Sequence, residues 1–77
     1  MIVLMKLLLK TNDYVLYSYG PDEFNLDGVI KFSLNSVDDF EVIRESSIGR
    51  RGTLRALCKI RKSILDKEIK ELLSYES

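Results

Sequence analysis

The residues best suited to chemistry are cationic, and they are concentrated in one short segment. Residues 50–62 contain six arginines and lysines and no acid. If a helix begins near Thr53, several of these cations gather at its N-terminus, where the macrodipole and free N–H groups also attract negative charge. The candidate anion-binding residues are Arg50, Arg51, Arg55, Lys59 and Lys62. This segment is predicted to attract a phosphate or the backbone of a nucleic acid.

The same cations have a purely structural explanation. Residues 11–49 carry eight acids and two bases, and the whole chain has a net charge of zero. The basic segment can therefore be balanced inside the fold or simply stay solvated. Zero net charge also weakens the nucleic-acid interpretation, because duplex binding is driven by neutralisation of phosphates. The sequence favours the structural explanation and leaves phosphate or nucleic-acid binding as the alternative.

Side chains suited to catalysis or metal binding are scarce. The chain has no histidine, the commonest general base, and a single cysteine, Cys58. Cys58 is predicted to pack as a small apolar side chain near the apolar stripe of the helix. Residues 23–28 resemble the start of a calcium loop, but Leu34 stands where that loop needs a bidentate acid. We predict a turn at the Asp-Gly pair, no catalytic residue, no metal, no cofactor and no enzyme activity.

Apolar residues at period two predict three or four strands in the first half of the chain. Residues 14–19 are apolar on both faces, which is typical of a central strand, and the acids of residues 40–45 suit a sheet edge. Residues 2–9 place Val3, Met5, Leu7 and Leu9 on one face, with a short helix or an element exchanged between subunits as alternatives. The predicted strands are residues 2–9, 14–19, 29–34 and 40–45.

A helical pattern then extends from Thr53 to about Tyr75, with Thr53 as the predicted N-cap. Pairs four residues apart, such as Asp66 with Lys70, suit the solvated face of such a helix. The predicted fold is α+β: an antiparallel β-meander of three to four strands followed by one long C-terminal helix packed on the sheet. Residues 1–77 are too few for more than one small domain.

The apolar arc of this predicted helix is wider than one sheet requires, which suggests a second helix as a partner. If two copies cross antiparallel between residues 64 and 65, Arg61 of one copy meets Glu68 of the other. The predicted dimer interface is Leu57, Ile60, Arg61, Ile64, Leu65, Glu68, Ile69 and Leu72. The alternative is a helix that packs only on its own sheet, with Arg61 and Glu68 at the margin.

These observations predict a small interaction or regulatory module rather than a specific activity. It is expected to self-associate as a homodimer through its C-terminal helix, and another protein partner is possible. A single cysteine excludes an internal disulfide and fits the cytoplasm. The apolar run at residues 1–9 is far shorter than the roughly 20 residues of a membrane span, so no membrane association is expected.

Overall fold

The computed structural model describes residues 2–36 and 38–76, and within them five strands and one helix. In chain order these are β1 (Ile2–Lys10), β2 (Tyr14–Gly20), β3 (Gly28–Ser33), β4 (Phe40–Arg44), α1 (Arg50–Leu65) and β5 (Leu72–Glu76). Met1 and Ser77, the ends of the predicted domain, and Val37, within a predicted turn, lie outside the described residues.

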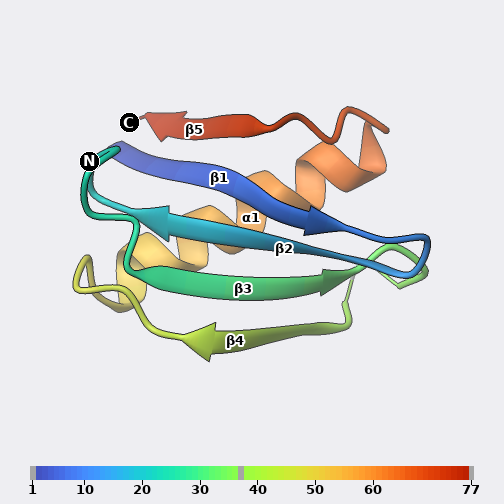
Figure 1. Ribbon diagram of the computed structural model, residues 1–77, viewed down its shortest axis with the longest axis horizontal. Helices are drawn as coiled ribbons and strands as arrows, with labels where there is room; N and C mark the ends of the chain where they lie inside the picture. Colours follow the sequence, from blue (N-terminus) through green and yellow to red (C-terminus); the bar gives the residue numbers. More distant parts are fainter. Residues whose placement is uncertain (1, 37, 77) are drawn as a thin grey trace.

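The five strands form one antiparallel sheet in the order β4-β3-β2-β1-β5, and α1 crosses one face of it diagonally (Figure 1). Strands β1 to β4 are a meander of neighbouring hairpins. The predicted α+β class, with a meander followed by a helix packed on the sheet, is confirmed. The sheet has more strands than the predicted three to four, because β5 follows the helix and pairs with β1.

Strand β2 lies in the middle of the sheet, as its two apolar faces predicted. Its inward residues Val15, Tyr17 and Tyr19 are almost completely buried against α1. Together with Met5 of β1 and Ile30 of β3 they make most of the core. Each side chain of this kind stabilises the fold by about 1.5–3 kcal/mol when it leaves water. The core therefore lies between the sheet and the helix.

Strand β1 changes faces part-way along its length. Its register on β2 slips between Leu7, opposite Tyr17, and Leu9, opposite Leu16, so Leu8 is the extra residue of a β-bulge. A one-residue slip moves every later side chain to the other face of the sheet. Leu9 was predicted to share the inward face of Val3 and Met5, and this is wrong: Leu9 lies on the outer face and is exposed.

The helix begins three residues earlier than predicted, and its N-cap is Gly49 rather than Thr53. Gly49 has a φ of 91°, which a residue with a Cβ rarely adopts. Thr53 lies inside the helix, where its hydroxyl donates to the Gly49 carbonyl at 3.2 Å. The first turn contains no acid, and the cap has no side-chain hydrogen bond. Arg50 and Arg51 therefore occupy the positive end of the helix without a local counter-charge.

The prediction that the helix continues to about Tyr75 is wrong, because α1 ends at Leu65. Lys67 has a φ of 57°, in the left-handed region. Its N–H donates to the Ile64 carbonyl at 3.1 Å, and the N–H of Glu68 donates to the Ser63 carbonyl at 2.9 Å. This pair of bonds is a Schellman motif, which normally has glycine at the position of Lys67.

Residues beyond this stop return as strand β5. Leu73 and Tyr75 point toward the core, and Leu72 and Ser74, which alternate with them along β5, point toward the outer face. The predicted helical pair of Asp66 with Lys70 is not formed. Lys70 instead lies 3.9 Å from a carboxylate oxygen of Glu68, and both side chains are exposed. The alternatives of a short helix or an exchanged element for residues 2–9 are not observed. This segment is strand β1, which pairs with β2 on one side and β5 on the other, both from the same chain.

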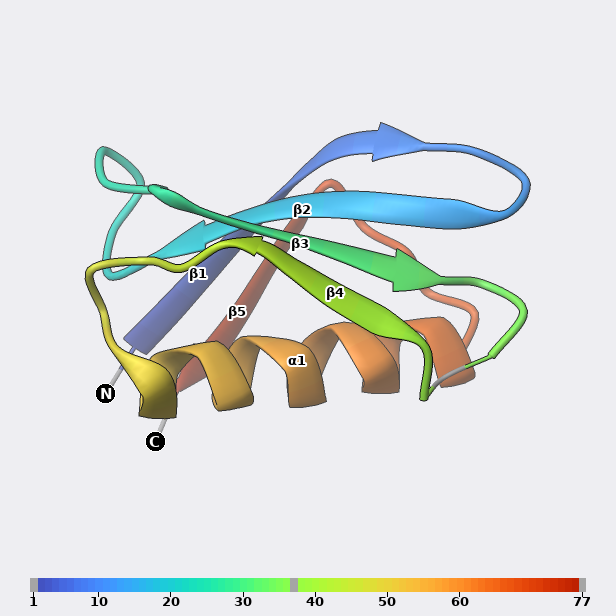
Figure 2. The same ribbon diagram turned by 90° about the horizontal axis from the view of Figure 1, so that it is seen from below.

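Figure 2 shows the consequence of this topology: the molecule has two layers, with α1 on one side of the sheet only. Among the described residues no second helix covers the opposite face. We call that side the open face. It is the side toward the viewer in Figure 1, where α1 lies behind the strands.

Candidate interaction surfaces

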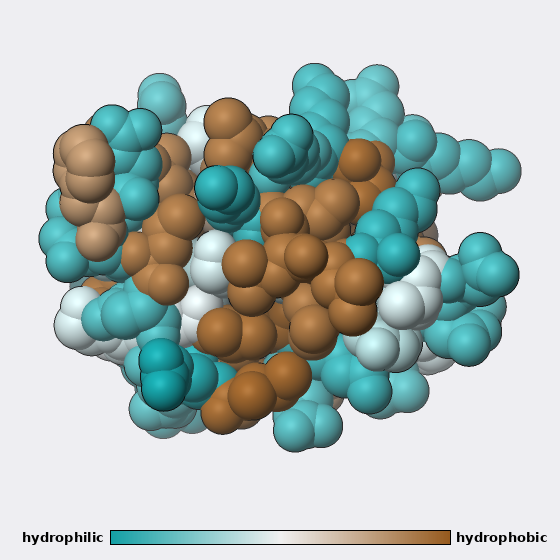
Figure 3. All heavy atoms as spheres, viewed as in Figure 1, coloured by the Kyte–Doolittle hydropathy of each residue, from teal (hydrophilic) through white to brown (hydrophobic). Residues whose placement is uncertain are grey.

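The open face carries a continuous apolar patch. Its five residues come from four neighbouring strands and alternate with the buried core positions: Leu4, Leu9, Leu16, Val29 and Leu72. We call these residues the open-face patch. Leu72 keeps 68% of its surface exposed. Figure 3 shows apolar residues running across this side of the molecule, with hydrophilic side chains around them. A contiguous apolar area on the surface of a small protein is a candidate interaction site.

Two bulges leave further apolar side chains of the sheet in water. Leu8 is the extra residue in β1, and the register of β4 on β3 also shifts, so that Ile43 falls between Val42 and Arg44. Both Leu8 and Ile43 are more than half exposed. Near the other edge of the sheet, Leu4 and Leu72 join Leu26 of the β2–β3 connection around a hollow of about 290 Å³.

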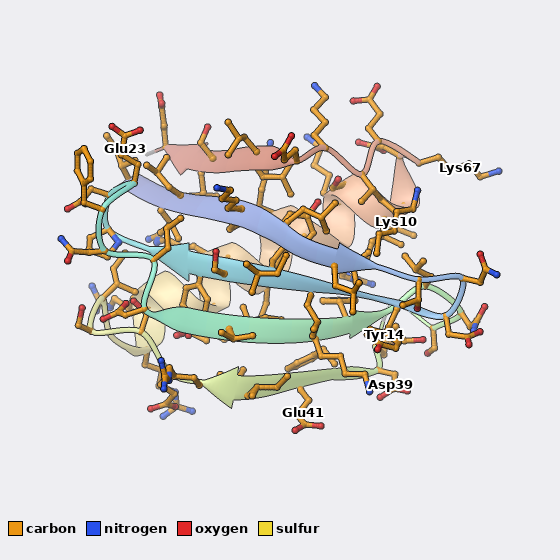
Figure 4. The ribbon with its side chains drawn as sticks, viewed as in Figure 1. Lys10, Tyr14, Glu23, Asp39, Glu41 and Lys67 are labelled. Atoms are coloured by element: carbon orange, nitrogen blue, oxygen red, sulfur yellow. The ribbon has the colours of Figure 1, made fainter. Side chains whose placement is uncertain are left out.

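One end of the open face is bordered by polar groups. Lys31 of β3 pairs across the sheet with Glu41 of β4, and its ammonium lies 4.5 Å from the centre of the Tyr14 ring. Tyr14, Asp39 and Glu41 gather at this end of the sheet (Figure 4) and, with Lys31, line a hollow of about 260 Å³. An apolar centre with a polar rim is the usual anatomy of a protein–protein interface.

The second surface is the outer side of α1. The helix carries all six cations of the basic segment and no acid. Among the described residues the only acid paired with any of them is Asp38, whose carboxylate lies 3.9 Å from Arg61, and both side chains are largely exposed. Arg50, Arg51 and Lys62 are exposed and Lys59 is partly so. Of the two structural explanations, balance by acids of the first half applies among the described residues to Arg61 alone, whereas the exposure of Arg50, Arg51 and Lys62 agrees with simple solvation.

Arg55 differs from the other members of the predicted set, because its side chain lies against β5. Its guanidinium donates to the Tyr75 hydroxyl at 2.6 Å and lies 5.0 Å from the centre of the Tyr75 ring. Its Nε is buried without a partner. Arg55 thus fixes the helix to the edge strand, while the same contact holds its charge beside Lys59 and Lys62.

The cations are arranged around an outer ridge formed by Leu54, Cys58 and Leu65. At about 100° per residue these three side chains share one line along the helix. Arg51 and Lys62 flank the ridge on one side, and Arg50 and Arg61 flank it on the other. All three ridge residues are exposed. The prediction that Cys58 packs as a small buried side chain near the apolar stripe of the helix is therefore wrong, because the sheet lies on the other side of the helix.

A chain of hydrogen bonds, buried at Tyr19 and reaching the surface at Asp27, positions the N-terminal half of α1. The Tyr19 hydroxyl lies 2.7 Å from Thr53 Oγ1 and accepts a bond from the Ser46 N–H at 3.2 Å. Ser46 in turn donates from its hydroxyl to Asp27, which also accepts from the Ser47 N–H at 3.1 Å. Bonds from Ser46 and then from Ser47 lower the pKa of Asp27 from 3.8 to about 2. The connection before the helix is thereby tied to β2 and β3.

Asp27 and Gly28 therefore act differently from the predicted turn pair. Gly28 begins β3, and a Cβ there would lie 2.3 Å from the Tyr19 ring. The turn lies earlier in the connection, where the Asn25 N–H donates to the Asp22 carbonyl at 3.1 Å. Glycine is required at position 28 because the ring of Tyr19 packs directly against the backbone.

A second tyrosine of β2 positions the other end of the helix. The Tyr17 hydroxyl donates to the Lys70 carbonyl at 2.6 Å, in the connection between α1 and β5. Burial raises the pKa of Tyr17 above 10.0. Because Tyr17 and Tyr19 are both buried, neither offers a stacking surface to a ligand.

The structure does not bring the predicted dimer residues onto one surface. Ile60 is fully buried, and Leu57, Ile64 and Ile69 pack against the core of their own chain. Leu65 lies on the outer ridge of α1, whereas Leu72 lies on the open face, on the opposite side of the molecule. Arg61 and Glu68 are separated by the end of the helix. The proposed crossing of two long helices is therefore lost together with the helix beyond Leu65.

Searches with the sequence and the structure add no relative. No protein-family model matches the chain, and no curated protein or solved structure matches it significantly. Among the described residues, no three histidine, cysteine, aspartate or glutamate side chains are grouped so that they could hold a metal ion. No helix in residues 2–36 and 38–76 has both the length and the apolar character needed to cross a bilayer.

Proposed function

We propose that this chain is a small interaction module that self-associates, with the open face of its sheet, rather than its helix, as the contact. The observation that carries the proposal is the open-face patch. Four neighbouring strands place five aliphatic side chains on one uncovered surface. Leu9 and Leu72 are exposed, and Leu4, Leu16 and Val29 are half-buried.

A second copy is the partner that fits this surface best. The molecule, which is seen from the side of the open face in Figure 1, measures 28 by 22 Å along its two longer axes. A stable interface buries roughly 800 Å² on each partner, so the whole face would be needed. Two such sheets pack with their faces about 10 Å apart, and their side chains interdigitate. The product is a four-layer dimer with one helix on each outer side.

The charged residues of the open face are compatible with this arrangement. The face carries Lys6, Lys31 and Arg44 as well as Glu41 and Glu76, so both signs are present. Long lysine side chains lay their methylene stems along apolar surfaces and keep their ammonium groups in water. Lys6, near the middle of the face, needs such an arrangement.

A matched pair of variants tests the proposal. Leu72→Glu places an acid on the open face opposite Lys6, and Leu54→Glu places one in the first turns of α1, where the helix dipole favours it. Leu72 is 68% exposed and Leu54 is 53% exposed, so both variants should fold. Size-exclusion chromatography with light scattering should show a dimer for the wild type and for Leu54→Glu, and a monomer for Leu72→Glu.

A second variant of the open face shows whether a loss of the dimer is specific to position 72 or common to the whole face. Leu16→Glu faces Lys31 across the sheet and should also give a monomer. Circular dichroism establishes that each variant is folded. A wild type that is monomeric at high micromolar concentration contradicts the proposal, as does a dimer that survives both open-face changes and dissociates on Leu54→Glu.

A further inference from the structure

Four of the five arginines in the chain lie on one helix of 16 residues. A guanidinium group makes two parallel hydrogen bonds to a phosphate and is more weakly hydrated than an ammonium group. Arginine is therefore the cation expected where phosphate is bound. The enrichment on α1 is independent of the open face, which lies on the other side of the sheet (Figure 2).

We infer that the outer side of α1 is a binding surface for duplex DNA, with Arg50, Arg51 and Lys62 on backbone phosphates and the ridge of Leu54, Cys58 and Leu65 directed into the major groove. The inference does not depend on the proposed dimer. In a dimer through the open face both helices remain on the outside, so either copy is free to bind.

The shape of the helix surface favours a duplex. The major groove of B-form DNA is about 12 Å wide, and an α-helix with its side chains is about 10–12 Å across. Cations flank the ridge on both sides, with Arg51 and Lys62 opposite Arg50 and Arg61. A helix that lies in the groove would therefore direct cations toward the phosphates of both strands.

Other polyanions fit this surface less well. Single-stranded nucleic acids are held by aromatic side chains that stack on bases, and α1 contains no aromatic residue. The major groove of A-form RNA is too narrow for side chains to reach its bases. An anionic membrane would need a larger apolar area than the exposed Leu54 and Leu65 provide.

The acids lie mainly toward the C-terminal end of the helix, so the N-terminal half of this surface is the more positive although the whole chain is neutral. Among the described residues only Asp38 is paired with a cation of the helix, at 3.9 Å from Arg61, and Asp66 and Glu68 line a hollow with Lys59 and Lys62. Asp39 and Glu41 lie at the end of the sheet where β4 begins (Figure 4), whereas Arg50 and Arg51 follow the other end of β4. Because contacts to phosphates release counterions, the affinity should be modest and should fall steeply with salt.

Fluorescence anisotropy with a labelled duplex of about 20 base pairs provides the test. For about four phosphate contacts, the affinity should fall roughly 100-fold between about 50 and about 200 mM salt. Arg51→Gln with Lys62→Gln should reduce the slope of log affinity against log salt by about 2. Lys6→Gln with Lys31→Gln removes the same charge from the open face and should leave the slope unchanged.

Cys58 supplies a direct readout of location, because it is exposed on the ridge and is the only cysteine in the chain. Saturating duplex should slow its alkylation by a maleimide at least severalfold, and the same concentration of free phosphate should not. Matched single-stranded DNA, duplex RNA and vesicles with phosphatidylglycerol serve as competitors and should bind more weakly than the DNA duplex.

Several results would overturn the inference. These are an absence of duplex binding at about 50 mM salt, equal losses in the two double variants, an unprotected Cys58 in the complex, and tighter binding of any one of the three competitors. The oligomeric state of the open-face variants is measured separately, so a failure here leaves the proposed self-association intact.

Discussion

The hydroxyl of Tyr19 lies 2.7 Å from the hydroxyl of Thr53 and joins the central strand to the first half of α1. Thr53 donates to the Gly49 carbonyl, so the Tyr19 hydroxyl is the donor to Thr53 and accepts from the Ser46 N–H. Tyr19 is completely buried. One side chain therefore satisfies polar groups of the connection and of the helix at once, and it sets where the basic surface of α1 lies over the sheet.

Loss of this hydroxyl should destabilise the protein measurably. Tyr19→Phe leaves the Ser46 N–H and the Thr53 hydroxyl without their buried partner, which should lower the free energy of unfolding by about 1–3 kcal/mol. Tyr17→Phe is the control, because the Lys70 carbonyl that loses its hydrogen-bond donor in this variant belongs to an exposed residue. Denaturant titrations measure both, and an unchanged midpoint for Tyr19→Phe would show that the hydrogen-bond chain does not stabilise the fold.

Replacing Lys67 by glycine should remove the conformational strain of its left-handed backbone. An L-residue in this conformation is destabilised by roughly 1–2 kcal/mol, part of which glycine loses again to its freedom in the unfolded chain. Lys67→Gly should therefore raise the free energy of unfolding by about 0.5–1 kcal/mol. Lys62→Gly removes the same charge inside α1 and should lower it by about 1 kcal/mol. If Lys67→Gly is as destabilising as Lys62→Gly, the helix does not stop at Leu65.

Asp27 should contribute to loss of stability in acid. Hydrogen bonds from Ser46 and Ser47 hold its pKa at about 2 in the folded protein, below the ordinary 3.8. A depressed pKa stabilises the fold above pH 3.8, and that contribution is lost as the pH falls from 3.8 toward 2. Asp27→Asn should flatten this part of the stability profile, and Ser46→Ala should flatten it in part. Asp22, whose pKa is lowered by Asn25 and Phe24, leaves some dependence in every variant.

A thermal-unfolding series across this pH range provides the measurement. Equal losses of stability in the wild type and in Asp27→Asn would mean that the carboxylate of Asp27 does not hold the β4–α1 connection.

Local patterns were sufficient to predict the meander. Alternation in β3 places Ile30 and Phe32 inward and Lys31 outward, as predicted. The apolar residues on both faces of β2 reflect its central position. The bulge at Leu8 was not predictable, because a single extra residue in a run of leucines leaves no mark on the pattern.

The end of the helix at Leu65 could not be predicted from the sequence for a different reason. Lys67 takes the left-handed position that glycine usually signals, so the sequence contains no stop. Ile69, Leu72 and Leu73 also recur at helical spacing, whereas Leu73 and Tyr75 recur at period two. Pairing with β1, almost seventy residues away in the chain, decides between the two, and no local pattern contains that information.

The candidate surfaces also divide into one that local sequence reveals and one that depends on residues far apart in the chain. A count of charges was enough to find the basic segment, but its exposure depends on where distant acids lie in the fold. The open-face patch was missed because it combines strands from both ends of the chain. Leu72, assigned to a helix contact, is the one predicted dimer residue that the structure places in that patch.

The distance between the two copies of Cys58 tests the central claim most directly. A spin label on this single cysteine requires no other change, and pulsed dipolar spectroscopy measures label separations in the dimer. Helices on the two outer sides of a four-layer dimer place the labels roughly 40 Å apart, from the thickness of a helix and the spacing of packed sheets. A distribution centred near that value supports contact through the open face. A separation below about 20 Å, as for two helices in contact, or the absence of any dipolar signal would contradict it.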